Sequence, residues 1–381
     1  MPVIMKSRTH SSGAAELPGF HLAARPLDAR QGLRMSDETL EAYVRGYIES
    51  QPRPDVEFTW QGGEPLLMGL PFFEKAVQLQ RHYANGKTIR NTLHTNGMLL
   101  DEAGCRFLAA NGFLVGLSLD GPRELHDGER HGAFEEVTRG LDLLIQHRVS
   151  VKARVTVSRA VSQQPLEVYR FLKSRGITHL RFYPVVERVL DEVSERSVEA
   201  DGYGRFLIAI YDEWIRHDVG RVQVMNFDWA LAAWTRLPGT VCLHSQRCGK
   251  AALAEPDGSV YSCDRFVTPE HRLGSLRDYQ VVQLMNSRQQ HEFGDAKLET
   301  LPAVCRRCEV RFACHGECPK NRFAVSPDGE PGLNYLCASY LNFFRHITPT
   351  MDVMSHLMAG GHDAALVMEA LKGPLIVKRR P

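Results

Sequence analysis

Cysteine placement constrains this 381-residue chain more than any other feature of its sequence. Eight of the nine cysteines lie between Cys242 and Cys337, and Cys105 stands alone outside that stretch. They form two groups, Cys242-x5-Cys248-x14-Cys263 and Cys305-x2-Cys308-x5-Cys314-x3-Cys318-x18-Cys337. Where thiols stay reduced, clustered cysteines bind metal more often than they form disulfides. The C-terminal third is therefore expected to fold around metal.

The two groups hold three and five thiols, whereas four-coordinate sites need four ligands each. One cysteine of the second group must therefore join the first. Two sets of four thiolates suit 4Fe-4S clusters, because soft sulfur ligands hold iron-sulfide cubes. Two structural zinc sites are the alternative, since Cys-x2-Cys occurs in both kinds of site and spacing does not separate them.

The remaining composition excludes several classes of protein. Hydrophobic residues make up 43% and charged residues 24%, which suits a globular protein of two or three domains. Lys and Arg total 46 against 45 for Asp and Glu, which gives no electrostatic reason to expect a nucleic-acid partner. No apolar run approaches the roughly 18 residues of a membrane helix, and no secretory signal is evident. These features predict a cytoplasmic protein with no membrane partner.

From residue 56 to about residue 225 the chain alternates short apolar strands with longer amphipathic stretches. Such alternation indicates a parallel sheet, and about six units fit a partial β/α barrel. We expect this barrel in residues 1–230 and a metal-bound domain in residues 231–381, with a helix at 340–358 that is bent or broken at Pro349. The predicted strands are 3–6, 56–60, 88–95, 113–119, 151–157, 179–183 and 221–224, and the predicted helices between them are 71–83, 101–110, 133–146, 164–174 and 201–216.

Polar motifs follow three of these strands. They read Gln61-Gly62-Gly63-Glu64-Pro65, Thr95-Asn96-Gly97 and Ser118-Leu119-Asp120-Gly121-Pro122. Loops after parallel strands line the ligand face of α/β folds, so the three motifs are expected to converge on one mouth. Each motif alone is also explained as a strand-to-helix turn, where Gly, Asn, Asp and Pro are favoured for backbone reasons.

The cysteine pattern, the 61–65 motif and the 113–122 segment together resemble the anaerobic sulfatase-maturating enzymes. These are members of the radical S-adenosylmethionine (SAM) superfamily that carry a SPASM extension, and the resemblance runs from about Leu33 to His356. It implies an α/β fold, with a partial (β/α)6 radical SAM barrel followed by a Cys-rich SPASM domain that binds two auxiliary 4Fe-4S clusters. It also implies that a Ser or Cys of a sulfatase polypeptide is oxidised to formylglycine, with a reducing electron donor of flavodoxin or ferredoxin type.

Carried over position by position, the resemblance implies the metal ligands. The first auxiliary cluster would be bound by Cys242, Cys248, Cys263 and Cys318, and the second by Cys305, Cys308, Cys314 and Cys337. Cys318 would then be the thiol that joins the other group.

The resemblance also implies residues around SAM and the substrate. Asp264 would be the general base that takes the substrate hydroxyl or thiol proton, because the negative charge of a neighbouring cluster favours proton uptake by a carboxylate. His94 stands where the family usually has Gln. The residues implied to surround SAM are Gly62, Gly63 and Glu64 at its methionyl end, with Ser118, Arg139 and Gln61, of which Gln61 would also lie near the substrate.

One expected motif is missing. Radical SAM enzymes hold their SAM-cleaving cluster through Cys-x3-Cys-x2-Cys after the first strand, and aligned on Ser12-Gly13 the three thiols fall at Ala14, Pro18 and His21. As written, the chain is not expected to cleave SAM. Family-like sequence flanks this island at 3–13 and from Leu33, so we hypothesise a pair of compensating frameshifts in the gene or its reported sequence.

Two other functions remain open from the sequence. A radical SAM/SPASM maturase of another peptide would share the barrel and the clusters. A noncatalytic two-cluster protein that binds a sulfatase or carries electrons would need no SAM-cleaving cluster.

Overall fold

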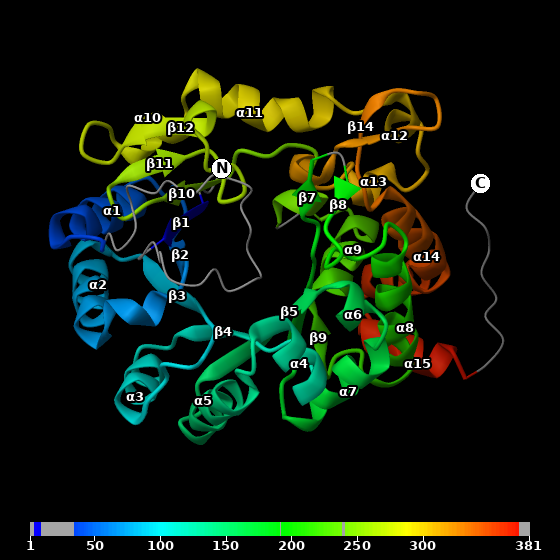
Figure 1. Cartoon of the computed structure of the whole chain (residues 1–381), viewed down its shortest axis with the longest axis horizontal. Coiled ribbons are helices and arrows are strands. Elements are labelled where there is room, and N and C mark those ends of the chain that lie inside the picture. Colours follow the sequence, from blue (N-terminus) through cyan, green and yellow to red (C-terminus); the bar gives the residue numbers. More distant parts are fainter. Residues whose placement is uncertain (1–3, 9–33, 191, 238–240, 373–381) are drawn as a thin grey trace. The chain divides into compact units, whose positions relative to one another are not determined.

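The computed structural model describes residues 4–8, 34–190, 192–237 and 241–372 (Figure 1). They form two compact units, and each unit combines segments that are distant in sequence. The first unit comprises Met1–Leu119, His126–Lys152 and Cys248–Ala296, and the second comprises Asp120–Leu125, Ala153–Arg247 and Lys297–Pro381. Because this grouping is not linear along the chain, the predicted boundary near residue 230 stays a prediction.

A mixed sheet with the strand order β12-β11-β10-β1-β2-β3-β4 forms the centre of the first unit. β1 to β4 run parallel, β10 lies parallel to β1, and β11 and β12 follow in antiparallel pairs. The segment between Cys248 and Cys263 therefore extends the edge of the barrel sheet. The strands are β1 (Ile4–Arg8), β2 (Asp55–Gln61), β3 (Thr88–Thr95), β4 (Leu114–Ser118), β10 (Ala251–Ala254), β11 (Ser259–Tyr261) and β12 (Arg272–Ser275).

Capped amphipathic helices accompany this sheet. Ser36 and Asp101 accept hydrogen bonds from the first-turn N–H groups of Thr39 and Gly104, which fixes where α1 and α3 begin. Tyr43 of α1 packs edge-on against Phe58 and Trp60 of β2, and all three side chains are fully buried. The helices are α1 (Asp37–Glu49), α2 (Leu70–Tyr83), α3 (Glu102–Ala110), α5 (Phe134–Gln146) and α10 (Val281–Met285), while α4 (Arg123–Arg130) and α11 (Arg288–Glu299) each contain a division between the units.

The second unit carries the next parallel strands and most of the C-terminal helices. β5 (Ser150–Val157), β6 (His179–Pro184) and β9 (Gln223–Val224) pair in parallel. The hairpins β7 (Arg188–Val189) with β8 (Glu192–Val193), and β13 (Ala324–Val325) with β14 (Pro331–Leu333), are short and antiparallel. Its helices are α6 (Arg159–Ser162), α7 (Pro165–Ser174), α8 (Gly202–His217), α9 (Met225–Trp234), α12 (Ala303–Arg306), α13 (Arg311–Cys314), α14 (Cys337–Ala359) and α15 (Val367–Ala370).

Most predicted elements are confirmed to within a residue or two. β3 spans the predicted 88–95, and the helix predicted at 133–146 is α5. The helix was predicted to be bent or broken at Pro349, and a break is wrong because α14 continues through this residue. Ile347 and Met351 on either side are fully buried, so packing of this face outweighs the hydrogen bond that proline cannot donate. Helix α1 was not predicted, although Ser36 followed by two acidic residues is a helix-start signal.

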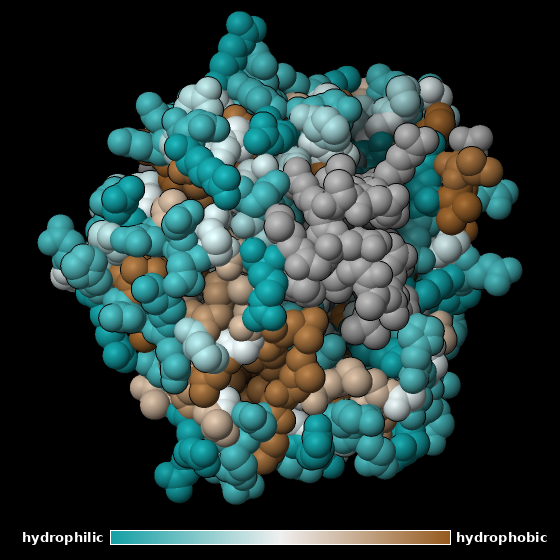
Figure 2. Space-filling model, turned by 60° about the vertical axis from the view of Figure 1, so that its left-hand side comes forward, coloured by the Kyte–Doolittle hydropathy of each residue, from teal (hydrophilic) through white to brown (hydrophobic). Residues whose placement is uncertain are grey.

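The surface shown in Figure 2 is largely hydrophilic, and apolar side chains gather on the lower part of that face. Among the described residues, no helix has both the length and the apolar character needed to cross a membrane.

Close packing of α8 against α14 generates a first prediction. A Cβ added at Gly204 would lie 2.5 Å from the backbone oxygen of Ser339. We expect Gly204→Ala to lower the free energy of unfolding by about 1–3 kcal/mol, because backbone on both sides must shift. Thermal unfolding followed by circular dichroism measures this. Gly128→Ala is the matched control, since nothing lies within 4 Å of its added Cβ, and equal unfolding midpoints in the two variants would contradict the prediction.

Candidate cofactor and cluster sites

Two of the residues implied to surround SAM lie at the carboxyl ends of strands in the first unit. Gln61 ends β2, Thr95 ends β3 and Ser118 ends β4. The strands are parallel and in register, with Thr95 opposite Leu117, so their carboxyl ends meet at one edge of the sheet. Gln61 and Ser118 are half-buried, whereas His94 is only 9% exposed. The expected convergence of the three polar motifs is therefore supported for the parts that lie in this unit.

The Glu64 carboxylate connects the loops at this edge of the sheet. Its carboxylate accepts hydrogen bonds from Leu66 N (3.0 Å), Thr95 Oγ1 (2.8 Å) and Asn96 N (2.8 Å). Burial of the side chain raises the pKa of Glu64, while these three bonds act in the opposite direction. One carboxylate thus joins the loop after β2 to the loop after β3.

Glycines let α5 approach the loop after β3. A Cβ at Gly140 would lie 2.4 Å from the backbone oxygen of Gly97, and Gly97 itself has a φ of +82°. The exposed Arg139 beside it donates from Nη2 to the backbone oxygen of Met98 at 3.1 Å. Arg139 therefore reaches the loop that follows the Thr95-Asn96-Gly97 motif.

A hydrogen bond connects β2 to the residue after a predicted cluster ligand. Gln61 Nε2 donates to Asp264 Oδ2 at 3.2 Å, across 203 positions of sequence and within the first unit. Asp264 Oδ1 lies 3.4 Å from Cys263 Sγ, and both residues are half-buried. The structure thus brings together the residue implied to lie near cofactor and substrate, the implied base and a thiol.

The two thiol-bearing loops of the first unit are held by α11. Gln290 is 1% exposed and donates from Nε2 to the backbone oxygens of Gly249 (2.9 Å) and Ser262 (3.2 Å), each next to a cysteine. Gly294 O accepts from Cys248 N at 3.1 Å. The Gln290 side chain fixes the backbone beside Cys248 and Cys263, and no sequence pattern indicates this role.

Four thiols of the second unit affect one another's pKa. Besides burial, Cys305 and Cys308 raise the pKa of Cys337, and Cys337 and Cys305 raise that of Cys314. Burial raises the pKa of the Cys314 thiol to about 12 and that of Cys337 to about 11. These four are the set implied for the second auxiliary cluster, and as soft thiol donors they fit it chemically. Loading such a set must displace protons.

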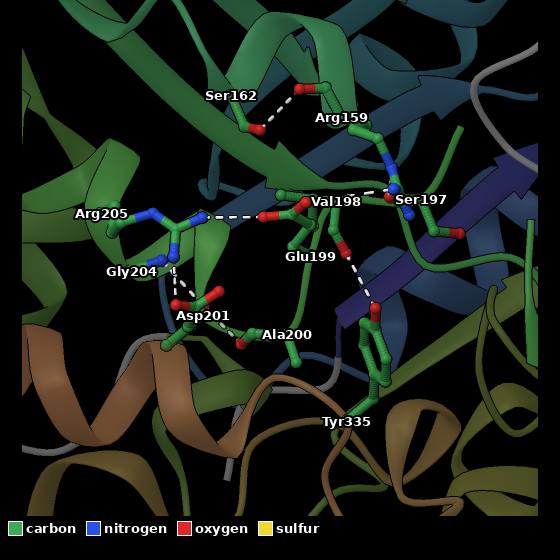
Figure 3. Close-up of polar contacts among 11 residues, drawn as sticks. Arg159, Ser162, Ser197, Val198, Glu199, Ala200, Asp201, Gly204, Arg205 and Tyr335 are labelled. Carbon is green, nitrogen blue, oxygen red and sulfur yellow. Dashed lines mark hydrogen bonds and ion pairs between the residues drawn. The ribbon is translucent and has the colours of Figure 1, made fainter. Parts of the chain in front are cut away.

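The residues on either side of Cys337 are hydrogen-bonded within the second unit. Tyr335 Oη donates to the backbone oxygen of Val198 at 3.1 Å (Figure 3). Ser339 Oγ donates to Ala200 O at 2.7 Å and accepts from Gly204 N at 2.8 Å. The start of α14, where Cys337 lies, is therefore bonded on both sides to the 198–204 segment.

The implied ligands of the first auxiliary cluster are divided between the two units. Cys248 and Cys263 belong to the first unit, whereas Cys242 and Cys318 belong to the second. Ala14, Pro18 and His21 lie outside the described residues. Within the described part of the chain, no group of three or more His, Cys, Asp or Glu residues is arranged to hold a single metal ion. Cys105 is fully buried on α3, as expected for a packing residue.

Comparison with family models defines the class of protein. Residues 25–172 match the radical SAM superfamily, and residues 247–309 match SPASM, an iron-sulfur cluster-binding domain. The fold is thus a partial radical SAM barrel followed by a SPASM domain, and the iron-sulfur interpretation of the cysteines is favoured over zinc.

Individual relatives narrow this class. The chain is 42% identical, over 89% of its length and 87% of the relative's, to a serine-type anaerobic sulfatase-maturating enzyme of Bacteroides thetaiotaomicron. A cysteine-type enzyme of Clostridium perfringens is 32% identical over 83% of this chain and 88% of its own. Native anSMEcpe with bound AdoMet and Cp18Cys peptide superimposes with a TM-score of 0.82, at 30% identity, over 93% of this chain and 99% of that chain. The chain belongs to the anaerobic sulfatase-maturating enzyme family, whose members are radical SAM enzymes.

The family's SAM-cleaving cluster does not fit the residues present. The sequence has no cysteine before Cys105, and the match to the radical SAM model begins at residue 25, after the positions where three thiols are expected. Ala14 and Pro18 have no side-chain ligand to offer, and one histidine cannot hold a cube of iron and sulfur.

The buried carboxylate at the strand ends generates a second prediction. Because the pKa of Glu64 is raised in the folded chain, the folded state favours its protonated form, and stability is lost as pH rises through that raised pKa. Glu64→Gln does not titrate, so we expect its unfolding free energy to fall less steeply with pH. Urea unfolding of the apo-protein at several pH values above 4.5 tests this, and parallel pH profiles would count against it.

Proposed function

We propose that this chain matures a sulfatase by acting on a serine of the sulfatase polypeptide. The assignment of serine rests on the 42% identity to a serine-type enzyme against 32% to a cysteine-type one. The proposal also includes a reducing, cytoplasmic setting and an electron donor of flavodoxin or ferredoxin type. The peptide in the related anSMEcpe structure supports a polypeptide substrate.

The hydrogen bond between Gln61 and Asp264 carries the proposal. Asp264 Oδ2 accepts a hydrogen bond from Gln61 Nε2, and Asp264 Oδ1 lies beside Cys263 Sγ. A carboxylate whose orientation is fixed in this way can accept a proton from a hydroxyl placed beside it. We assign Asp264 as the base and Gln61 as the residue that orients it.

Converting CH2OH to CHO breaks one C–H and one O–H bond and removes two electrons and two protons. Asp264 accepts the proton of the hydroxyl. SAM, when bound beside its cleaving cluster, would supply the acceptor of the hydrogen atom on carbon, which carries one proton and one electron. The auxiliary clusters, when bound, would supply the acceptor of the remaining electron. The ligands of the SAM-cleaving cluster are absent from the sequence as written, so the oxidation requires the reading frame that the frameshift hypothesis restores.

We propose two auxiliary clusters with the ligand sets that the resemblance implies. The second set is supported because Cys305, Cys308, Cys314 and Cys337 belong to one unit and neighbouring thiols of the set raise the pKa of Cys314 and Cys337. The first set, Cys242, Cys248, Cys263 and Cys318, rests on the cysteine count and on the family. For SAM, we propose that Gly62, Gly63 and Glu64 surround its methionyl end, with Ser118, Arg139 and Gln61 nearby.

A peptide-binding cycle tests the role of Asp264 with the chain as it is written. We expect Asp264→Ala to weaken binding of a sulfatase peptide with serine at the target position by about 1 kcal/mol more than binding of the same peptide with alanine there. The reason is that only serine has a hydroxyl for the carboxylate to accept from. Fluorescence anisotropy with labelled peptides gives the four affinities, and equal losses for the two peptides would remove Asp264 from the site.

Anaerobic reconstitution tests the clusters and the missing motif. Two 4Fe-4S clusters predict about eight irons per chain, and the absent thiols predict no 5′-deoxyadenosine from SAM and dithionite. A colourless protein that binds two zinc ions would refute the cluster assignment. Resequencing the gene over codons 9–33 tests the frameshift hypothesis. A verified reading frame without cysteines would refute that hypothesis and would favour a noncatalytic two-cluster protein.

A further inference from the structure

A fully buried lysine lies beside one of the proposed cluster ligands. Lys297 is 0% exposed and donates from Nζ to the backbone oxygens of Leu243 at 2.9 Å and Ser245 at 2.6 Å, and also to that of Cys242. All of these residues belong to the second unit. Three carbonyls around one ammonium use its three N–H donors. The Lys297 side chain therefore binds three backbone oxygens of the turn that contains Cys242.

Arg322 is a second cation, and it extends the hydrogen-bond network of Lys297 to the turn between Cys314 and Cys318. Arg322 donates from Nη1 to the backbone oxygen of Lys297 at 2.6 Å. It also donates to the backbone oxygens of His315 (2.9 Å) and Gly316 (2.9 Å), which lie between Cys314 and Cys318. The turns of Cys242 and of Cys314 to Cys318 thus share one hydrogen-bonded support.

Two further contacts fasten the two turns. His244, within the Cys242 turn, places Nδ1 3.1 Å from the backbone oxygen of Ala313. Glu317 is 3% exposed and accepts from Cys318 N and from Asn334 Nδ2 at 3.2 Å. All of these bonds are made by backbone groups and by side chains other than the thiols.

The charge of Lys297 has a consequence that a neutral support would not have. A cluster with four thiolate ligands carries net negative charge, and reduction adds one more. A buried cation close to it acts through a low effective dielectric, so the attraction is stronger than at the surface. It stabilises the reduced cluster more than the oxidised one.

We propose that Lys297 is a positioning residue of the first auxiliary cluster, which pre-forms the Cys242 turn and raises the reduction potential of the cluster that Cys242 helps to hold. The part about potential rests on the proposed function, because it needs that cluster to bind. The part about the turn does not.

Alkylation of the apo-protein tests the turn. Lys297→Met removes all three hydrogen bonds and the charge, and we expect Cys242 to react several-fold faster with iodoacetamide, read by mass spectrometry of its peptide. Lys372→Met is the matched control, since Lys372 is an exposed lysine of the same unit that pairs with Glu369. Unchanged Cys242 labelling in Lys297→Met would overturn the pre-formed turn.

Lys297→Gln separates charge from hydrogen bonding, and serves if the methionine variant fails to fold. Its amide keeps two N–H donors but no charge, so Cys242 labelling is expected to stay near the wild-type rate. An EPR-monitored redox titration is expected to show one cluster at lower potential, by about 59 mV for each tenfold loss in relative stability of the reduced form. Potentials equal to wild type in this variant would overturn the electrostatic role. A wild-type protein that takes up no iron would refute the cluster assignment itself, and Cys242 labelling would still decide the role in the turn.

Discussion

Backbone hydrogen bonding in the thiol-bearing turns is the constraint on which the rest of this structure depends. Cys248, Cys308 and Cys318 lie in irregular backbone. Irregular backbone that is buried must still pair its N–H and C=O groups. The chain solves this with a few buried polar side chains, Gln290 in the first unit and Lys297 in the second, both carried by α11. Removing such a side chain leaves several buried carbonyls without a donor, which costs more than the bonds themselves contribute.

At the strand ends of the first unit, a buried carboxylate rather than a buried ammonium binds the polar groups of the loops. Glu64 ties two loops together through one carboxylate, much as Lys297 ties one turn through one ammonium. Burial makes either charge costly, so each is accompanied by a full set of hydrogen bonds. A loop held in this way keeps its shape when no ligand is present, and a pre-formed site loses less conformational entropy when a ligand binds.

The sequence predicted what depends on local pattern and missed what depends on distant contact. Strand and helix positions follow from apolar periodicity, so β3 and α5 fall where they were expected. The cysteine count gave two sets of four thiols because ligand number is a chemical requirement. Gln290 and Lys297 were missed, since a polar residue on a helix reads as exposed until the carbonyls it binds are known. The predicted break at Pro349 is wrong for a related reason, because the burial of the residues around Pro349 decides whether the helix continues.

The intact supports bear on the missing cysteine motif. A protein that had lost SAM cleavage would still need its clusters if it carried electrons, but it would have no use for a proton acceptor aimed by Gln61 beside Cys263. Nor would it need Glu64 to join the loops where SAM is proposed to bind. We propose that those contacts serve chemistry at the mouth of the barrel, and they occur in the same chain as an island of about twenty residues, between Gly13 and Leu33, without family likeness. An error of reading frame confined to that island explains this combination with one event, whereas gradual loss of function predicts damage at the mouth as well.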